Sequence, residues 1–95
     1  MEDYATCVII LKSGQVLVSK VHARETDEFQ IGEPDMVLID PVSFDESVEI
    51  EKSMKRFPGK HLTTVTKMEI HSDNALVMVK PTNKVLSEYL VTISD

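Results

Sequence analysis

Residues 8–42 constrain the fold most, because short apolar runs alternate there with turn residues as in a β-meander. The segment begins VIILKSGQVLVSKV, in which two runs rich in Val, Ile and Leu flank Ser13 and Gly14. A two-residue turn with glycine in second place is typical of a tight hairpin. A third apolar run, MVLIDPV, follows a polar segment, and Pro41 limits that strand to an edge or a bulge near its end. We therefore expect an antiparallel sheet that starts with this hairpin.

Residues 43–57, SFDESVEIEKSMKRF, fit either a strand or a helix. Ser43 and Glu46 have the spacing of a capping box, and acids precede bases as a helix dipole favours. A strand is indicated by apolar side chains at every second position, with Lys52 as the exception. The positions in that alternation are Val48, Ile50 and Met54. Both alternatives stay open, and the strand is preferred because the first three strands need a fourth partner.

The rest of the chain predicts extended segments followed by a helix. Residues 61–71 are rich in Thr and β-branched side chains, and ALVMVK, which Pro81 ends, predicts a last buried strand. Thr82 or Asn83 has the side chain of a helix N-cap. The apolar face of that helix carries Val85, Leu86, Tyr89 and Leu90.

The chain has 95 residues, which predicts one domain over residues 1–95. A domain this small buries little apolar surface, and small domains compensate with disulfides, metals or oligomerisation. Cys7 is the single cysteine, so no disulfide forms within the chain. The histidines are far apart and no Cys/His pair has the spacing of metal ligands. We expect no metal, no cofactor and a homo-oligomer.

Charge is distributed unevenly along the chain, whose net charge is −6. Residues 1–51 hold twelve acids and three bases, whereas residues 52–95 hold four acids and seven bases. This asymmetry indicates an anionic face and a local basic site. The start MEDYAT is acidic, unlike a signal peptide, and no apolar run is long enough to span a bilayer. We expect a soluble, cytoplasmic protein.

The basic site is the segment KSMKRFPGKH, which holds no acid and has Phe57 in its middle. Its bases are Lys52, Lys55, Arg56, Lys60 and His61. Cations beside an aromatic ring suit a single-stranded nucleic acid, because phosphates pair with Lys and Arg while bases stack. The alternative is that Phe57 belongs to the core and the bases form a solvated edge that discourages strand pairing.

An enzyme is not expected from these residues. Cys7 lies in an apolar run without a base beside it, as a nucleophile would require. Carboxylates gather in one charged segment, where they form a solvated face. These acids are Glu25, Asp27, Glu28, Glu33 and Asp35.

Taken together, the runs VIILKSG, QVLVSKV and MVLID resemble the Sm/LSm-like family, in particular the small Sm-like proteins encoded by marine phages. Gly14 matches the turn glycine of the first family motif and Asp40 its trailing acid. KRFPG is a loose counterpart of the second motif, and Pro81 followed by a helix ending in SEYL matches the phage group. Val37 stands where the family has an Asn that contacts the base. The valine side chain cannot form that hydrogen bond to the base.

The resemblance implies a small, strongly bent, five-stranded antiparallel SH3-like barrel with a short C-terminal helix. It further implies a cyclic homo-oligomer that binds RNA or single-stranded DNA, in the host cytoplasm if the protein is phage-encoded. Met36 and Phe57 would then offer stacking surface. Phosphates would meet Lys55, Arg56, Lys60 and His61, so Arg56→Ala with Lys60→Ala should weaken binding without unfolding the chain. The alternative function is an oligomeric scaffold whose acidic face recruits a basic partner protein.

Overall fold

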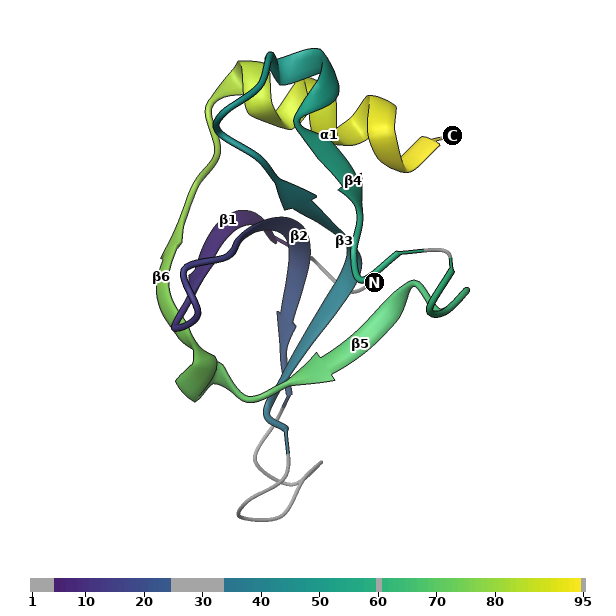
Figure 1. Ribbon diagram of the computed structural model, residues 1–95. Coiled ribbons are helices and arrows are strands. Elements are labelled where there is room, and N and C mark those ends of the chain that lie inside the picture. Colours follow the sequence, from purple (N-terminus) through teal and green to yellow (C-terminus); the bar gives the residue numbers. More distant parts are fainter. Residues whose placement is uncertain (1–4, 25–33, 60, 95) are drawn as a thin grey trace.

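The computed structural model describes residues 5–24, 34–59 and 61–94, and these form a mainly β fold with a C-terminal helix (Figure 1). Six antiparallel strands are found within these residues, rather than the expected five. They are β1 (Ala5–Leu11), β2 (Val16–Ala23), β3 (Met36–Phe44), β4 (Met54–Arg56), β5 (Lys67–Ile70) and β6 (Ala75–Val79). The helix α1 spans Asn83–Ser94, and 3₁₀ helices span Ile50–Lys52 and Ser72–Asn74.

The first hairpin, β1 with β2, forms where it was predicted but with a longer turn. The Gly14 N–H donates to Leu11 O at 2.8 Å, and the Leu11 N–H donates to Gln15 O at 2.9 Å. Gly14 has a φ of +91°, which glycine adopts at little cost. The connection is therefore a three-residue loop closed by a bulge, one of the common hairpin turns, and not a two-residue turn.

β3 is the central strand, and it continues past Pro41 instead of ending there. β2 pairs along one edge of β3, while β5 and then β4 pair along the other. Asp40 has a φ of +52°, and Asp40 and Pro41 together lie opposite Ser19 as a bulge in the β2–β3 ladder. The predicted bulge at Pro41 is confirmed, and the strand bends there.

β4 and β5 are the two halves of one interrupted strand, which is why six strands form instead of five. The Phe57 N–H donates to Pro41 O at 3.0 Å, and the Asp40 N–H donates to Thr66 O at 2.7 Å. Residues 57 and 66 therefore lie opposite neighbouring residues of β3, and the chain between them leaves the sheet and returns. We call residues 57–66 the excursion loop.

The ambiguous segment 45–57 is neither a continuous strand nor an α-helix. Turns and a 3₁₀ helix precede the three-residue strand β4. The expected capping box does not form; instead Asp45 Oδ1 accepts hydrogen bonds from the Ser47 hydroxyl at 2.6 Å and the Ser47 N–H at 2.9 Å. These two bonds, the one from the hydroxyl above all, lower the pKa of the Asp45 carboxyl.

Both faces of the sheet are packed. On one face the buried residues are Ile9, Leu17, Met36 and Leu38, with Phe57 against them. On the other face the buried residues are Val18, Val42 and Met54 of the sheet, and Tyr89 of α1 packs against them. Adjacent residues Leu17 and Val18 thus belong to opposite cores, because side chains alternate across a strand. A continuous apolar run is therefore the pattern that β2 requires.

The helix α1 packs one face on the sheet near β3 and β4 (Figure 1). The Val85 N–H donates to the Thr82 hydroxyl at 3.3 Å, which confirms Thr82 as the predicted cap. Tyr89 is fully buried, but Leu90 is exposed, so the predicted apolar face is wrong at that position. Among the described residues, no helix is long and apolar enough to cross a membrane.

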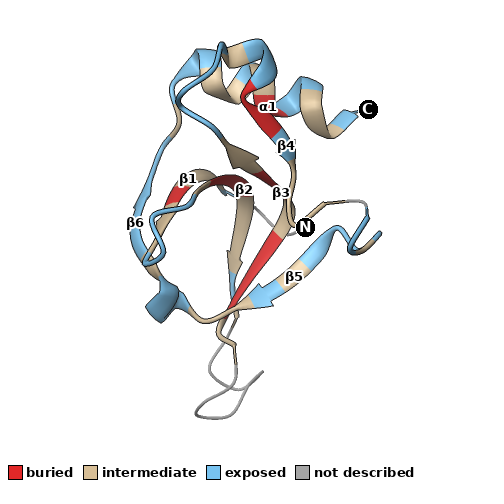
Figure 2. Cartoon of the chain, in the orientation of Figure 1, coloured by how far each residue is buried: buried red, intermediate tan, exposed pale blue. Residues whose placement is uncertain are grey.

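β6 was expected to be buried, and it is not (Figure 2). It pairs with β1 alone among the described strands, so its other edge is open. Leu76, Val77, Met78 and Val79 are between 41% and 63% exposed. Four consecutive exposed apolar side chains on a strand edge are unusual for a monomer, because such an edge readily pairs with another chain.

Candidate nucleic-acid interface

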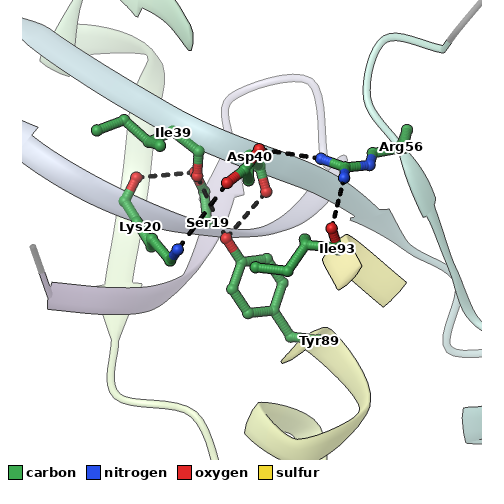
Figure 3. A network of polar contacts seen from close by, with 7 residues as sticks. All are labelled: Ser19, Lys20, Ile39, Asp40, Arg56, Tyr89 and Ile93. Carbon is green, nitrogen blue, oxygen red and sulfur yellow. Dashed lines mark hydrogen bonds and ion pairs between the residues drawn. The ribbon is translucent and has the colours of Figure 1, made fainter. Parts of the chain in front are cut away.

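A polar network fixes the point where the bent strand β3 meets β4 and α1 (Figure 3). The Arg56 Nη1 lies 3.1 Å from Asp40 Oδ1, and Arg56 Nη2 donates to Ile93 O at 2.7 Å. The other carboxylate oxygen of Asp40 lies 3.9 Å from Lys20 Nζ. Arg56 thus joins the bend to the last turn of α1, where a cation is favoured by the helix dipole.

Tyr89 and Ser19 hold the same bend from inside (Figure 3). The Tyr89 hydroxyl lies 2.9 Å from Asp40 O and 3.2 Å from Ile39 O, and the Ser19 hydroxyl lies 3.1 Å from Ile39 O. Burial raises the pKa of Tyr89 to about 12, so the hydroxyl stays protonated and donates at neutral pH. These hydroxyls therefore bind the two carbonyl groups that precede Pro41 at the bulge.

The excursion loop encloses a cavity of about 190 Å³ with Pro41 at its base. Its remaining lining comes from the end of β4 and the loop itself: Arg56, Phe57, Gly59, Thr63, Thr64, Val65 and Thr66. The lining is mainly apolar, with one guanidinium and several hydroxyls around it. We call this the loop pocket.

A second cavity, of about 360 Å³, lies beside the loop pocket and is lined by three basic side chains. They are Lys55, Arg56 and His61, with Ser43, Pro58 and Gly59 completing the wall. We call this the basic pocket; it shares Arg56 and Gly59 with the loop pocket. Gly59 has a φ of +131°, a backbone conformation that favours glycine, and the His61 imidazole lies close to it, with Cε1 2.8 Å from where a Cβ would be.

Acidic side chains border the basic pocket on its far side. A larger cavity of about 630 Å³ contains Lys52 and Lys55 but also Asp45 and Glu46. Lys55 contributes to lowering the pKa of the Asp45 carboxyl, after the hydrogen bonds from Ser47. Lys52 therefore lies among acids, and within the described part of KSMKRFPGKH the basic strip runs from Lys55 to His61.

The structure brings together some of the predicted site residues and separates others. Lys55 and His61 are exposed in the basic pocket, and Phe57 is half-buried beside it. Met36 is only 4% exposed in the core, which leaves no open surface for stacking. Arg56 is held by Asp40 and Ile93 rather than projecting freely. Lys60 lies outside the described residues.

The loop-pocket threonines were not recognised as site residues. The run TTVT predicted extended chain, whereas residues 61–66 form a turn and an irregular return to the sheet. The available signal was Pro58-Gly59 followed by Thr63, because a hydroxyl that closes a local turn favours a loop. The Thr63 hydroxyl does accept from the Val65 N–H at 3.0 Å.

The other candidates from the sequence find structural roles or lie outside the described residues. Asp35 accepts hydrogen bonds from the Ser72 hydroxyl at 2.6 Å and the Ser72 N–H at 2.7 Å, which lower the pKa of its carboxyl. Burial raises the pKa of the Cys7 thiol, the opposite of what a nucleophile requires. The acids Glu25, Asp27, Glu28 and Glu33 lie outside the described residues.

Fold and site together define a small antiparallel β-sheet protein with a C-terminal helix and a basic strip beside an aromatic ring. Residues 5–94 match a family of unknown function (DUF6561), and the chain belongs to that family. Comparison with curated proteins and with solved structures finds no match.

Proposed function

We propose that this protein is a non-enzymatic, ring-forming, Sm-like protein that binds RNA or single-stranded DNA and acts in its processing or chaperoning. The observation that carries the proposal is the basic pocket: Lys55, Arg56 and His61 line one cavity, and Phe57 lies beside it. Phosphates suit the cations, and an unpaired base suits the aromatic face. The cytoplasm, of the host cell if the protein is phage-encoded, is the proposed location.

The finer fold we propose is the bent five-stranded Sm-like barrel. Counting β4 and β5 as one interrupted strand along β3 gives the five strands that the resemblance implies. The sharp bend at Asp40 supports it, because a small barrel needs its central strand to turn a corner.

Assembly into a ring is supported by the two open edges of the sheet. β4 ends the sheet on one side and β6 on the other, and the exposed side chains of β6 are apolar. Pairing β6 of one copy with the opposite edge of the next copy is a head-to-tail contact, which closes into a ring at a suitable rotation. A ring would repeat the basic pocket and increase affinity for a strand by avidity.

The test is fluorescence anisotropy of a labelled oligo-U or oligo-A strand, measured at several salt concentrations. Binding should weaken as salt rises, because each phosphate contact releases counterions. The variant Lys55→Ala with Lys60→Ala, which removes two of the predicted phosphate contacts, should reduce the log–log salt slope by about 0.7 for each lysine that contacts a phosphate. Arg56 is left intact because it also stabilises the fold.

The matched control is Lys80→Ala with Lys84→Ala, which removes two exposed lysines far along the chain from the basic pocket. Its salt slope should equal that of the unmodified protein. Equal slopes for both double variants would remove the site assignment. A stable oligomer with no affinity for either strand at low salt would instead favour the scaffold function.

A further inference from the structure

We propose that the loop pocket holds a single unpaired nucleobase while the phosphate of the same nucleotide lies in the basic pocket. This inference rests on the proposed function and adds the part of the nucleic acid that the protein recognises. The two pockets adjoin, because Arg56 and Gly59 contribute to the walls of both. A nucleotide carries a base and a phosphate in one molecule. The apolar loop pocket suits the base, and the adjoining basic pocket suits the phosphate.

The loop pocket has the size and lining for one planar ring. Its volume of about 190 Å³ is below the roughly 300–1,000 Å³ typical of sites for drug-sized ligands. Phe57 supplies an aromatic wall, and the buried Pro41 supplies the base of the pocket. Phe57 itself packs against the core, so the wall is rigid. A flat, unpaired base gains most from such a wall, because stacking needs a fixed face.

The hydroxyls at the rim provide hydrogen bonds for the edge of the base. Thr64 and Thr66 line the pocket, and each hydroxyl can both donate and accept. The carbonyl of Thr66 accepts from the Asp40 N–H, and the Val65 N–H is held by Thr63. Those bonds hold the backbone of residues 63–66 beside β3. Hydroxyls that both donate and accept tolerate several base edges, which predicts weak discrimination among bases.

The positions of Lys55 and His61 indicate where the phosphate of the bound nucleotide lies. Both side chains are exposed, and both line the basic pocket on the other side of Gly59. Gly59 contributes to both pockets, and the imidazole of His61 lies close to it. A base in duplex nucleic acid is stacked and paired and cannot enter such a pocket without being extruded. The protein should therefore prefer single strands to duplexes of equal charge.

The decisive experiment compares oligo-U with an abasic strand of the same length, by competition against the labelled oligo-U at low salt. Both strands carry the same phosphates, so the difference measures the bases alone. We expect the abasic strand to bind roughly 5- to 100-fold more weakly, given the usual contribution of base stacking. Equal affinities would overturn the base pocket while leaving nucleic-acid binding intact. No binding of either strand would overturn the proposed function and the base pocket together.

Two substitutions in the excursion loop test whether the base binds in the loop pocket. Thr64→Phe fills the loop pocket from its rim, whereas Leu62→Phe adds an equal ring at an exposed position that does not line it. Thr64→Phe should lower the affinity for oligo-U to that for the abasic strand, and Leu62→Phe should change neither. Unchanged oligo-U affinity in Thr64→Phe would overturn the proposal. Circular dichroism should show that both variants keep the β fold.

Discussion

Arg56 and Asp40 form an ion pair at 3.1 Å across the interrupted edge of the sheet, and the same guanidinium bonds the carbonyl of Ile93 in α1. One side chain therefore joins the bend of β3, the strand β4 and the C-terminal helix (Figure 3). The sequence indicated a phosphate-binding role for Arg56. Its structural partners show that it also determines where the helix packs.

Arg56→Ala should destabilise the protein by about 2 kcal/mol, because it removes a charge-assisted hydrogen bond and leaves Asp40 without its nearest cation. Urea denaturation would measure the loss. The matched control is Lys55→Ala, the exposed neighbour on the same strand, which should stay within about 0.5 kcal/mol. Equal stability of the two variants would contradict the structural role of Arg56.

Tyr89→Phe should cost about 1 kcal/mol at neutral pH, since it removes the hydroxyl that bonds the carbonyls at the bend. Its second effect appears at alkaline pH. The pKa of Tyr89 is raised to about 12 in the folded chain, so the protonated form is favoured by folding. That contribution is complete below pH 10 and is lost as the pH rises from about 10 to about 12, by roughly 3 kcal/mol in total.

The stability profiles of the unmodified protein and the Tyr89→Phe variant, measured by urea denaturation at several pH values, should therefore cross between about pH 10 and pH 12. The unmodified protein is the more stable below the crossing and the less stable above it. Every other ionisable group is the same in both proteins, so the difference between the profiles isolates the tyrosine hydroxyl. Parallel profiles would show that the hydroxyl is not buried as described.

Ser72→Ala should raise the pKa of Asp35 toward its ordinary value, because the hydrogen bond from the Ser72 hydroxyl is the largest cause of the lowered pKa. The bond favours the ionised carboxyl. It therefore stabilises the fold above the ordinary carboxyl pKa, and this contribution is lost as the pH falls below it. NMR titration of the carboxyl would report the change. Ser47→Ala is the matched control, since it should shift Asp45 and leave Asp35 unaffected.

The proposed ring uses the open edge of β6, so Val79→Glu should disrupt it by placing a charge on that edge. Light scattering of the variant should give a smaller mass than the unmodified protein gives. Val91→Glu is the matched control on the outer face of α1, where the valine is similarly exposed. An unchanged mass for Val79→Glu would exclude β6 from the subunit contact.

The strands and the helix could be predicted because their signals are local. The apolar runs of β1 to β3 and the Thr82 cap depend on neighbours in the sequence, and both appear as expected. The predicted length of the turn between β1 and β2 was wrong, because a glycine with positive φ fits both a two-residue turn and a bulged three-residue turn. The exposure of β6 was missed for a different reason: an apolar strand has the same sequence pattern whether its partner is in the chain or in another copy.

The site was only partly predictable because its form depends on pairings distant in sequence. The cluster of bases in the sequence includes Lys55 and His61, and the structure places both in the lining of one cavity. The burial of Met36 and the engagement of Arg56 follow from packing against β5 and α1, which no local pattern reveals. The loop pocket exists because β4 stops and β5 resumes along β3, and that interruption is a property of the β3 bend.

The most direct test of the central claim is light scattering coupled to size exclusion, with and without a fluorescent oligo-U or oligo-A strand at low salt. We expect a discrete oligomer larger than the monomer, with which the strand co-elutes. A monomer that elutes apart from the strand would contradict both the ring and the nucleic-acid interface.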